Sequence, residues 1–109
     1  MKSLKFHPVL IPLILSKRKT VTWRLFDDKN LKKKDVVNFI NSKTLEKFAK
    51  AELTNIKIKK FKELTENDWK GHEKYGSDKE MYKKYTEYYK KPINEKTELK
   101  IISFRLITS

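Results

Sequence analysis

The sequence SKRKTVTWR, residues 16–24, is the most informative part of the chain. Residues 20–26 alternate in the manner of a strand, and successive side chains of a strand point to opposite faces. Thr22 and Arg24 are therefore expected on one face, with Lys19 at the entrance of the strand. The pattern predicts that a hydroxyl, a guanidinium and an amine lie close together.

Two interpretations of this strand remain open. One is an edge strand of β-branched residues flanked by ordinary solvated bases. The other is a polar cleft for a phosphate, a base edge or an acyl group. Arg24 favours the cleft, because the chain has only three arginines among its 27 basic residues.

Length and composition limit the possible classes of protein. The 109 residues are predicted to form one domain, residues 1–109, with 38% hydrophobic and 38% charged side chains. The chain has no cysteine, which excludes disulfides, thiolate metal sites and a thiol nucleophile. The two histidines, His7 and His72, show no metal-ligand spacing. We therefore expect neither a metal nor another cofactor.

The longest apolar run, residues 9–15, is too short to span a membrane and contains Pro12. It leads into a basic segment, residues 16–19, without a small-residue cleavage site. This arrangement argues against a signal peptide and predicts a cytoplasmic protein.

Positive charge is concentrated in the first half of the chain. The net charge is +13, and residues 1–60 hold 16 basic and 5 acidic side chains. Such asymmetry suggests an anionic partner, most simply nucleic acid, with the exposed loop Lys32-Lys33-Lys34 contacting phosphates. A biased genome composition is the alternative source of the many lysines.

Strand and helix patterns alternate along the chain, which predicts a mixed α/β domain with a mainly antiparallel, barrel-like sheet. In the long extended region, Ala51 and Leu53 have the opposite parity to Ile56 and Ile58, so we expect a bulge near residues 54–55. The predicted strands cover residues 4–6, 20–26, 36–40, 45–64 and 99–107, and the predicted helices begin near Pro8, Thr65 and Ser77.

The helix after Ser77 carries an apolar stripe and is expected to end before Pro92. Its tyrosines could stack on nucleobases, but packing in the core is the favoured interpretation. The stripe comprises Met81, Tyr82, Tyr85, Tyr88 and Tyr89.

Together these features resemble the ASCH domain, a small member of the PUA-like superfamily, over residues 4–107. The resemblance is carried by a Lys-Thr-x-Thr-x-Arg string at residues 19–24, Leu-Thr at 64–65 and Ile-x-x-Phe at 101–104. Two residues depart from the family pattern, since Lys34 and Ser16 stand where glycine is usual. Both substitutions are expected to alter turns.

The resemblance implies a small β-barrel flanked by helices, with a cleft that serves RNA or modified nucleosides. It places the cleft on the Lys-Thr-x-Thr-x-Arg strand. The residues expected to bind nucleic acid or a nucleoside are Lys17, Arg18, Lys19, Thr20, Thr22, Arg24, Lys32, Lys33 and Lys34.

Some small bacterial ASCH proteins remove the acetyl group from acetylcytidine with a lysine, a threonine and a glutamate. The resemblance places the first two on Lys19 and Thr22, and the third best on Glu73, whose neighbour His72 is the alternative residue facing the cleft. A desolvated lysine can activate a threonine hydroxyl, and a carboxyl group can move a proton to the leaving amine. Three interpretations remain open: binding without chemistry, amide hydrolysis, and a structural interaction domain that has no ligand.

Overall fold

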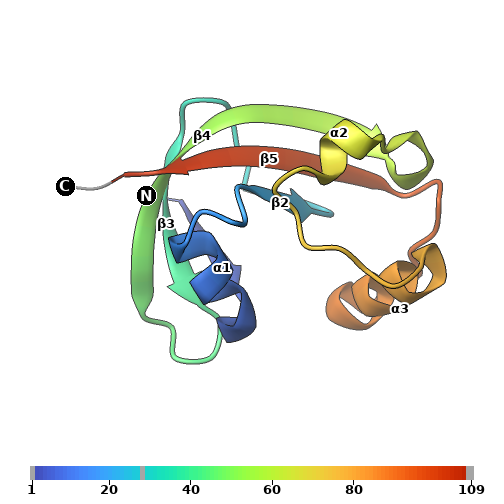
Figure 1. The fold of residues 1–109 in the computed structure, drawn as a ribbon, viewed down its shortest axis with the longest axis horizontal. Coiled ribbons are helices and arrows are strands. Elements are labelled where there is room, and N and C mark those ends of the chain that lie inside the picture. Colours follow the sequence, from blue (N-terminus) through green and yellow to red (C-terminus); the bar gives the residue numbers. More distant parts are fainter. Residues whose placement is uncertain (1, 28, 108–109) are drawn as a thin grey trace.

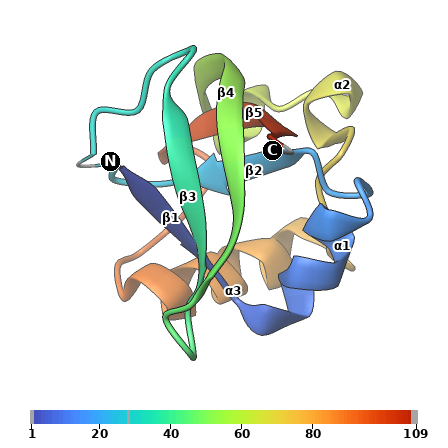
Figure 2. The same cartoon turned by 90° about the vertical axis from the view of Figure 1, so that its left-hand side faces the viewer.

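The computed structural model describes residues 2–27 and 29–107. Five strands form one curled sheet in the order β1-β3-β4-β5-β2, in which only the β1–β3 pair is parallel. Figures 1 and 2 show a half-barrel with β1 and β2 at its edges, which confirms the predicted mixed α/β class. The strands are β1 (Ser3–Phe6), β2 (Val21–Arg24), β3 (Val36–Asn41), β4 (Lys47–Lys60) and β5 (Glu98–Leu106).

The helical elements are short except for α3. In Figure 1, α1 and α3 lie on the same side of the sheet, with β2 between and above them. Within the described part of the chain, no helix is long and apolar enough to cross a membrane. The elements are η1 (Pro8–Leu10), α1 (Ile11–Leu15), η2 (Phe61–Glu63), α2 (Glu66–Trp69) and α3 (Asp78–Tyr89).

The predicted bulge in β4 is confirmed. The register with β5 shifts between Leu53 and Asn55, and this extra residue changes which side chains face inward. Leu53 is fully buried, and Ile56 packs against the same group of residues although its parity differs. Ile58 is 64% exposed, so the bulge brings only Ile56 to the core.

The buried residues form two clusters. The barrel cluster fills the curled sheet and contains Leu4, Phe6, Ile14, Leu31, Val37, Phe39, Ala51, Leu53, Ile102 and Phe104. The helix cluster lies between α3 and the other end of the sheet and contains Trp23, Leu25, Phe61, Met81, Tyr85, Ile93, Leu99 and Ile101.

Two strands are shorter than predicted, and a third is shifted by one residue. The strand expected over 20–26 is β2, and it ends at Arg24 because Phe26 has φ 53° and turns the chain away. The extended region expected over 45–64 is β4, which ends at Lys60 and continues into η2. The last strand begins and ends one residue earlier than predicted.

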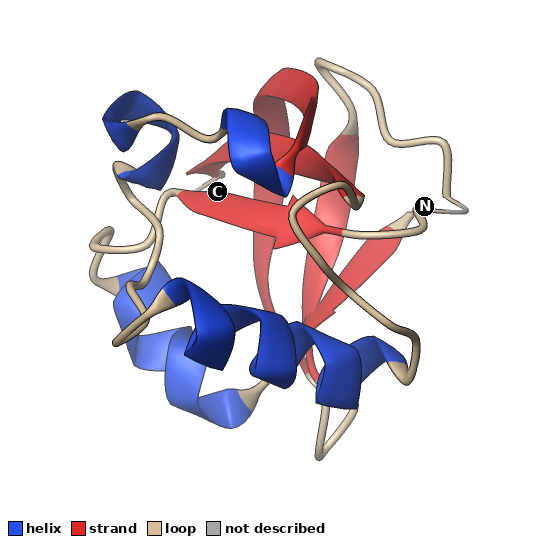
Figure 3. Cartoon of the chain, turned by 90° about the vertical axis from the view of Figure 1, so that its right-hand side faces the viewer, coloured by secondary structure: helices blue, strands red, loops and turns tan. Residues whose placement is uncertain are grey.

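Helix α3 begins and ends with the expected local chemistry. The Ser77 hydroxyl accepts a hydrogen bond from the Glu80 amide at 3.2 Å, which satisfies a donor of the first turn. Lys90 ends the helix in the left-handed conformation, two residues before Pro92. Figure 3 shows the helix running along one side of the sheet. Tyr85 is buried in the helix cluster, whereas Tyr88 is 61% exposed.

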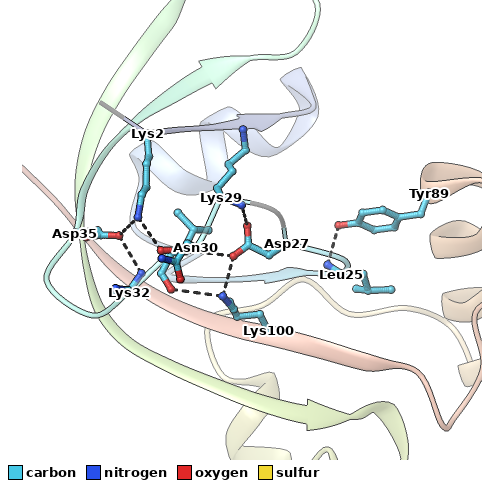
Figure 4. A network of polar contacts seen from close by, with 10 residues as sticks. Lys2, Leu25, Asp27, Lys29, Asn30, Lys32, Asp35, Tyr89 and Lys100 are labelled. Carbon is cyan, nitrogen blue, oxygen red and sulfur yellow. Dashed lines mark hydrogen bonds and ion pairs between the residues drawn. The ribbon is translucent and has the colours of Figure 1, made fainter.

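The connection between β2 and β3 is held by two ion pairs (Figure 4). The Lys100 ammonium lies 2.7 Å from the Asp27 carboxylate, and the Lys2 ammonium lies 2.9 Å from the Asp35 carboxylate. Lys34, where the sequence resemblance leads one to expect glycine, has φ 77°. This connection therefore presents the exposed lysines 32–34 from a fixed backbone.

Candidate functional site

A cavity of about 190 Å³ lies where β2 meets the chain before and within α3. Its walls come from β1, η1, the segment between α1 and β2, β2 itself, the segment between α2 and α3, and α3. The lining residues are Lys5, Phe6, His7, Leu10, Lys19, Thr22, Trp23, Arg24, His72, Glu73, Tyr75, Lys84, Tyr85, Tyr88 and Tyr89.

The structure brings together four of the predicted site residues. Lys19, Thr22, Arg24 and Glu73 all line this cavity. The lining residues do not include the other predicted binding residues. Lys17 and Thr20 line a second hollow beside β5, which Lys19 also borders, and Arg18 and lysines 32–34 are exposed.

Lys19 is a buried lysine with two partners. Its side-chain nitrogen donates to the Val21 carbonyl at 2.9 Å and to the Glu73 carboxylate, while the residue is only 3% exposed. Burial lowers the pKa of Lys19, because it disfavours the charged amine; Arg24 adds to this effect and Glu73 opposes it. At a given pH, the neutral amine is therefore a larger fraction of Lys19 than of a solvated lysine.

His72 fixes the position of Glu73. The His72 ring stacks on the Trp23 indole, with the ring centroids 3.9 Å apart and an interplanar angle of 19°. Its Nδ1 lies 2.7 Å from the Glu73 carbonyl oxygen, so Nδ1 carries the proton and donates. Burial and the charge of Lys19 lower the pKa of His72 to about 4, and the ring is neutral at pH 7.

Both residues left as alternatives by the sequence, Glu73 and His72, line the cavity. Burial, the strongest single influence on Glu73, acts to raise its pKa. The neighbouring His72 and the charge and hydrogen bond of Lys19 outweigh burial, so the pKa of Glu73 is below its ordinary value. At neutral pH the cavity therefore holds a carboxylate.

Gly71 joins the segment that carries Glu73 to the start of β2. Its carbonyl accepts hydrogen bonds from the Thr20 amide at 2.9 Å and the Val21 amide at 3.2 Å. Gly71 has φ +78°, and a Cβ at this position would lie 2.0 Å from the Thr20 hydroxyl oxygen. Only glycine fits this close approach of the Gly71 backbone to Thr20. The sequence pattern gave no indication that the two residues meet.

Arg24 lies at another wall of the cavity in a fixed orientation. Its guanidinium donates to the Lys5 carbonyl at 2.7 Å and lies over the Phe6 ring, 4.6 Å from the centroid. Contacts with β1 therefore fix the orientation of Arg24, which belongs to β2.

Several lining residues could not be predicted from the sequence. Lys5, His7 and Lys84 reach the cavity from β1, the following residue and α3. No spacing rule joins these positions, and only the strand pairing and helix packing bring them together. Among the described residues, no group of three His, Cys, Asp or Glu side chains could hold a metal ion.

Solved structures with a similar fold are known, although sequence comparison alone finds no match. No family model and no curated protein matches the sequence. The ASCH domain from Lactobacillus crispatus JV V101 matches with a TM-score of 0.64 and 13% identity, covering 96% of this chain and 79% of that chain. ASCH from Zymomonas mobilis matches with a TM-score of 0.67 and 14% identity, covering 94% and 65%.

A third solved structure is similar over its whole length. The hypothetical protein PH0355 has 25% identity and a TM-score of 0.73, covering 98% of this chain and 100% of that chain. The protein thus has an ASCH-like fold, as the sequence resemblance predicted. At these identities the similarity to the two ASCH structures concerns the fold alone.

Proposed function

We propose that the protein binds a nucleoside, either free or at an unpaired position of an RNA strand, with its base in the cavity at Thr22. The observation that carries the proposal is the composition of the cavity. Aromatic side chains, Trp23 and Tyr85 among them, wall a space that also contains a buried lysine paired with a half-buried glutamate. Aromatic walls favour a planar ring, and buried polar groups select its edge.

The polar groups match a base edge that offers both a donor and an acceptor. Glu73 contacts Lys19 through Oε1, so Oε2 is available to accept from an exocyclic amine. The Lys19 ammonium has three donors and uses two on protein atoms, which leaves one for a ring nitrogen or carbonyl. Cytosine offers this combination, because its amine donates and its ring nitrogen and carbonyl accept.

Calorimetric titration with cytidine, uridine and adenosine tests the proposal. Cytidine should bind most tightly, and Glu73→Gln should weaken it at least tenfold, because the amide cannot replace both the charge and the pairing with Lys19. Glu66→Gln is the matched control, since Glu66 lies exposed on α2, and it should leave binding within twofold. Absence of binding by every nucleoside and by unpaired RNA would exclude the proposal.

An RNA strand would extend beyond the cavity to the exposed lysines 32–34. Each phosphate contact releases counterions, so binding of single-stranded RNA should weaken steeply with salt. Replacing the three lysines by alanine should reduce the slope of log K against log salt by roughly 2–3 units if all three contact phosphate. An unchanged slope would show that residues other than these three lysines contact the RNA phosphates.

Amide hydrolysis of an acetylated cytidine is the second candidate function, and the lowered pKa of Lys19 favours it. In this reaction the Thr22 oxygen would attack the acetyl carbonyl while neutral Lys19 takes the hydroxyl proton. The C–N bond would then break as the proton passes, directly or through Glu73, to the leaving amine. Water would cleave the acetyl ester, releasing acetate and restoring the Thr22 hydroxyl.

Acetate release from acetylcytidine tests this second function. Thr22→Ala and Lys19→Ala should each abolish release, and the double variant should be little worse than either, because residues acting as one unit are not additive. Thr20→Ala is the control, since Thr20 borders the other hollow. The rate should rise with pH as Lys19 loses its proton. If the wild-type protein binds acetylcytidine but releases no acetate from neutral to alkaline pH, hydrolysis is excluded and only the binding function remains.

A further inference from the structure

We propose that the cavity has a phosphate subsite built around Arg24, so that its ligand is a nucleotide rather than an uncharged nucleoside. This inference rests on the proposed function and adds a second recognition element to the same site. The phosphate is either the monoester of a free nucleotide or a diester within an unpaired RNA strand.

The charge of the cavity wall is the first argument. The lining contains the cations Lys5, Lys19, Arg24 and Lys84, and Glu73 is its single carboxylate. Glu73 is already paired with Lys19, and Lys84 is paired with Glu80 outside the lining. Over residues 2–27 and 29–107, no carboxylate lies within ion-pair distance of Arg24 or Lys5. The cavity therefore has uncompensated positive charge, which an uncharged ligand would leave without a counterpart.

The fixed orientation of Arg24 is the second argument. One of its five N–H donors is used by the Lys5 carbonyl, and the Phe6 ring supports the guanidinium plane. The remaining N–H groups can donate to two oxygens of one phosphate in the bidentate geometry that arginine favours. Because the side chain is already ordered, less rotamer entropy is lost on binding than for a free arginine.

The neighbours of Arg24 supply further donors. The Nδ1 of His7 accepts from the Val9 amide at 3.2 Å, so a neutral His7 carries its proton on Nε2. Lys5, two residues before His7 in the chain, adds an ammonium, and both side chains line the cavity. This end of the cavity thus offers donors from three residues, which suits the acceptor oxygens of a phosphate.

The spacing along β2 fits a single ligand. Thr22 and Arg24 line the same cavity and are two residues apart on the strand, a separation of about 7 Å. A ribose can span this gap between a base near Thr22 and a phosphate at Arg24. The two subsites therefore correspond to the two ends of one nucleotide.

Calorimetry with cytidine, cytidine 5′-monophosphate and a cytidine-containing dinucleotide tests the subsite. The wild type should bind the monophosphate, the dinucleotide or both at least tenfold more tightly than cytidine, and the phosphorylated ligand that gains affinity identifies the source. Arg24→Met should abolish this gain, lowering the affinity for the phosphorylated ligand at least tenfold more than the affinity for cytidine. Arg18→Met is the matched control, because Arg18 is an exposed arginine outside the lining, and it should retain the gain.

Two results separate failure of the subsite from failure of the proposed function. Equal affinity of the wild type for cytidine and both phosphorylated ligands, or equal loss of all three in Arg24→Met, would overturn the phosphate subsite alone. Ribose 5-phosphate serves as the probe without a base. If it bound as tightly as the monophosphate, the subsite would stand and the base-binding function would fall.

Discussion

The barrel cluster and the helix cluster differ in the atoms that they bury. The barrel cluster consists entirely of aliphatic and phenylalanine side chains, whereas the helix cluster includes Trp23 and Tyr85. The buried His72 lies beside the helix cluster, where its ring stacks on Trp23. One cluster therefore provides apolar packing alone, and the other combines packing with buried polar side chains.

This difference explains where the cavity forms. Close packing of apolar side chains leaves few voids, but polar groups must keep partners or access to a ligand when they are buried. Among the described residues, the indole nitrogen of Trp23 has no hydrogen-bond partner although it is buried. The cavity lies at the junction, where β2 contributes Trp23 to one side and Arg24 to the other.

The largest expected effect comes from removing a ring in the barrel cluster. Phe39 is fully buried, and its ring centroid lies 4.7 Å from that of Phe6 and 4.9 Å from that of Phe104. Phe39→Ala should lower the free energy of unfolding by about 3–5 kcal/mol, because it leaves a cavity among close-packed rings. Urea denaturation measures this. Ile58→Ala, at an exposed strand position, should change stability by less than about 1 kcal/mol.

The second prediction separates the cavity from the barrel. Gly71→Ala would place a methyl group against the Thr20 hydroxyl at a left-handed backbone position, and should destabilise the protein by about 2–3 kcal/mol. It should also displace Glu73 from Lys19 and abolish nucleoside binding. Gly76→Ala is the matched control, since its Cβ would meet only the flexible end of Glu80. Normal binding by Gly71→Ala would contradict the role assigned to this glycine.

Local sequence patterns predicted the helices and strands better than the contacts between them. The alternation of residues 20–26 placed Thr22 and Arg24 together, and the change of parity in β4 located its bulge. Both are short-range signals, because strand periodicity is a property of neighbouring residues. The exact ends of the strands depend on backbone turns such as that at Phe26, which its residue type does not predict.

The site depends on contacts between distant positions. Lys19 and Glu73 are 54 residues apart, and only the family resemblance suggested that they meet. The Gly71–Thr20 approach and the support of Arg24 by β1 have no periodic signal, since they arise from how separate elements pack. The turn before the Lys-Thr string also differs from the expectation. The left-handed conformation falls on Lys17 rather than on Ser16, where glycine was expected.

The third prediction uses the buried histidine beside the helix cluster. The pKa of His72 is about 4 in the folded state and 6.5 in the unfolded chain, so the unfolded state binds the proton more readily. The stability present above pH 6.5 should fall with decreasing pH, by about 2 kcal/mol between pH 8 and pH 5. Denaturation curves at these two values should show this loss, and His72→Gln should remove most of it. An equal loss in the variant would assign the effect to other groups.

The smallest effect tests the backbone outside both clusters. Lys34 adopts φ 77°, a conformation that a residue with a Cβ enters at a cost of roughly 1 kcal/mol, while its amide donates to Leu53 at 2.7 Å. Lys34→Gly relieves this strain, although glycine also gains freedom in the unfolded chain. A net stabilisation of about 0.5 kcal/mol is expected in thermal or urea unfolding. Lys33→Gly is the matched control, because Lys33 is not among the residues with positive φ, and it should be neutral or slightly destabilising. Lower stability in Lys34→Gly than in Lys33→Gly would show that the lysine side chain contributes more than the strain removes. Nucleoside binding should be the same in both variants, since neither residue lines the cavity.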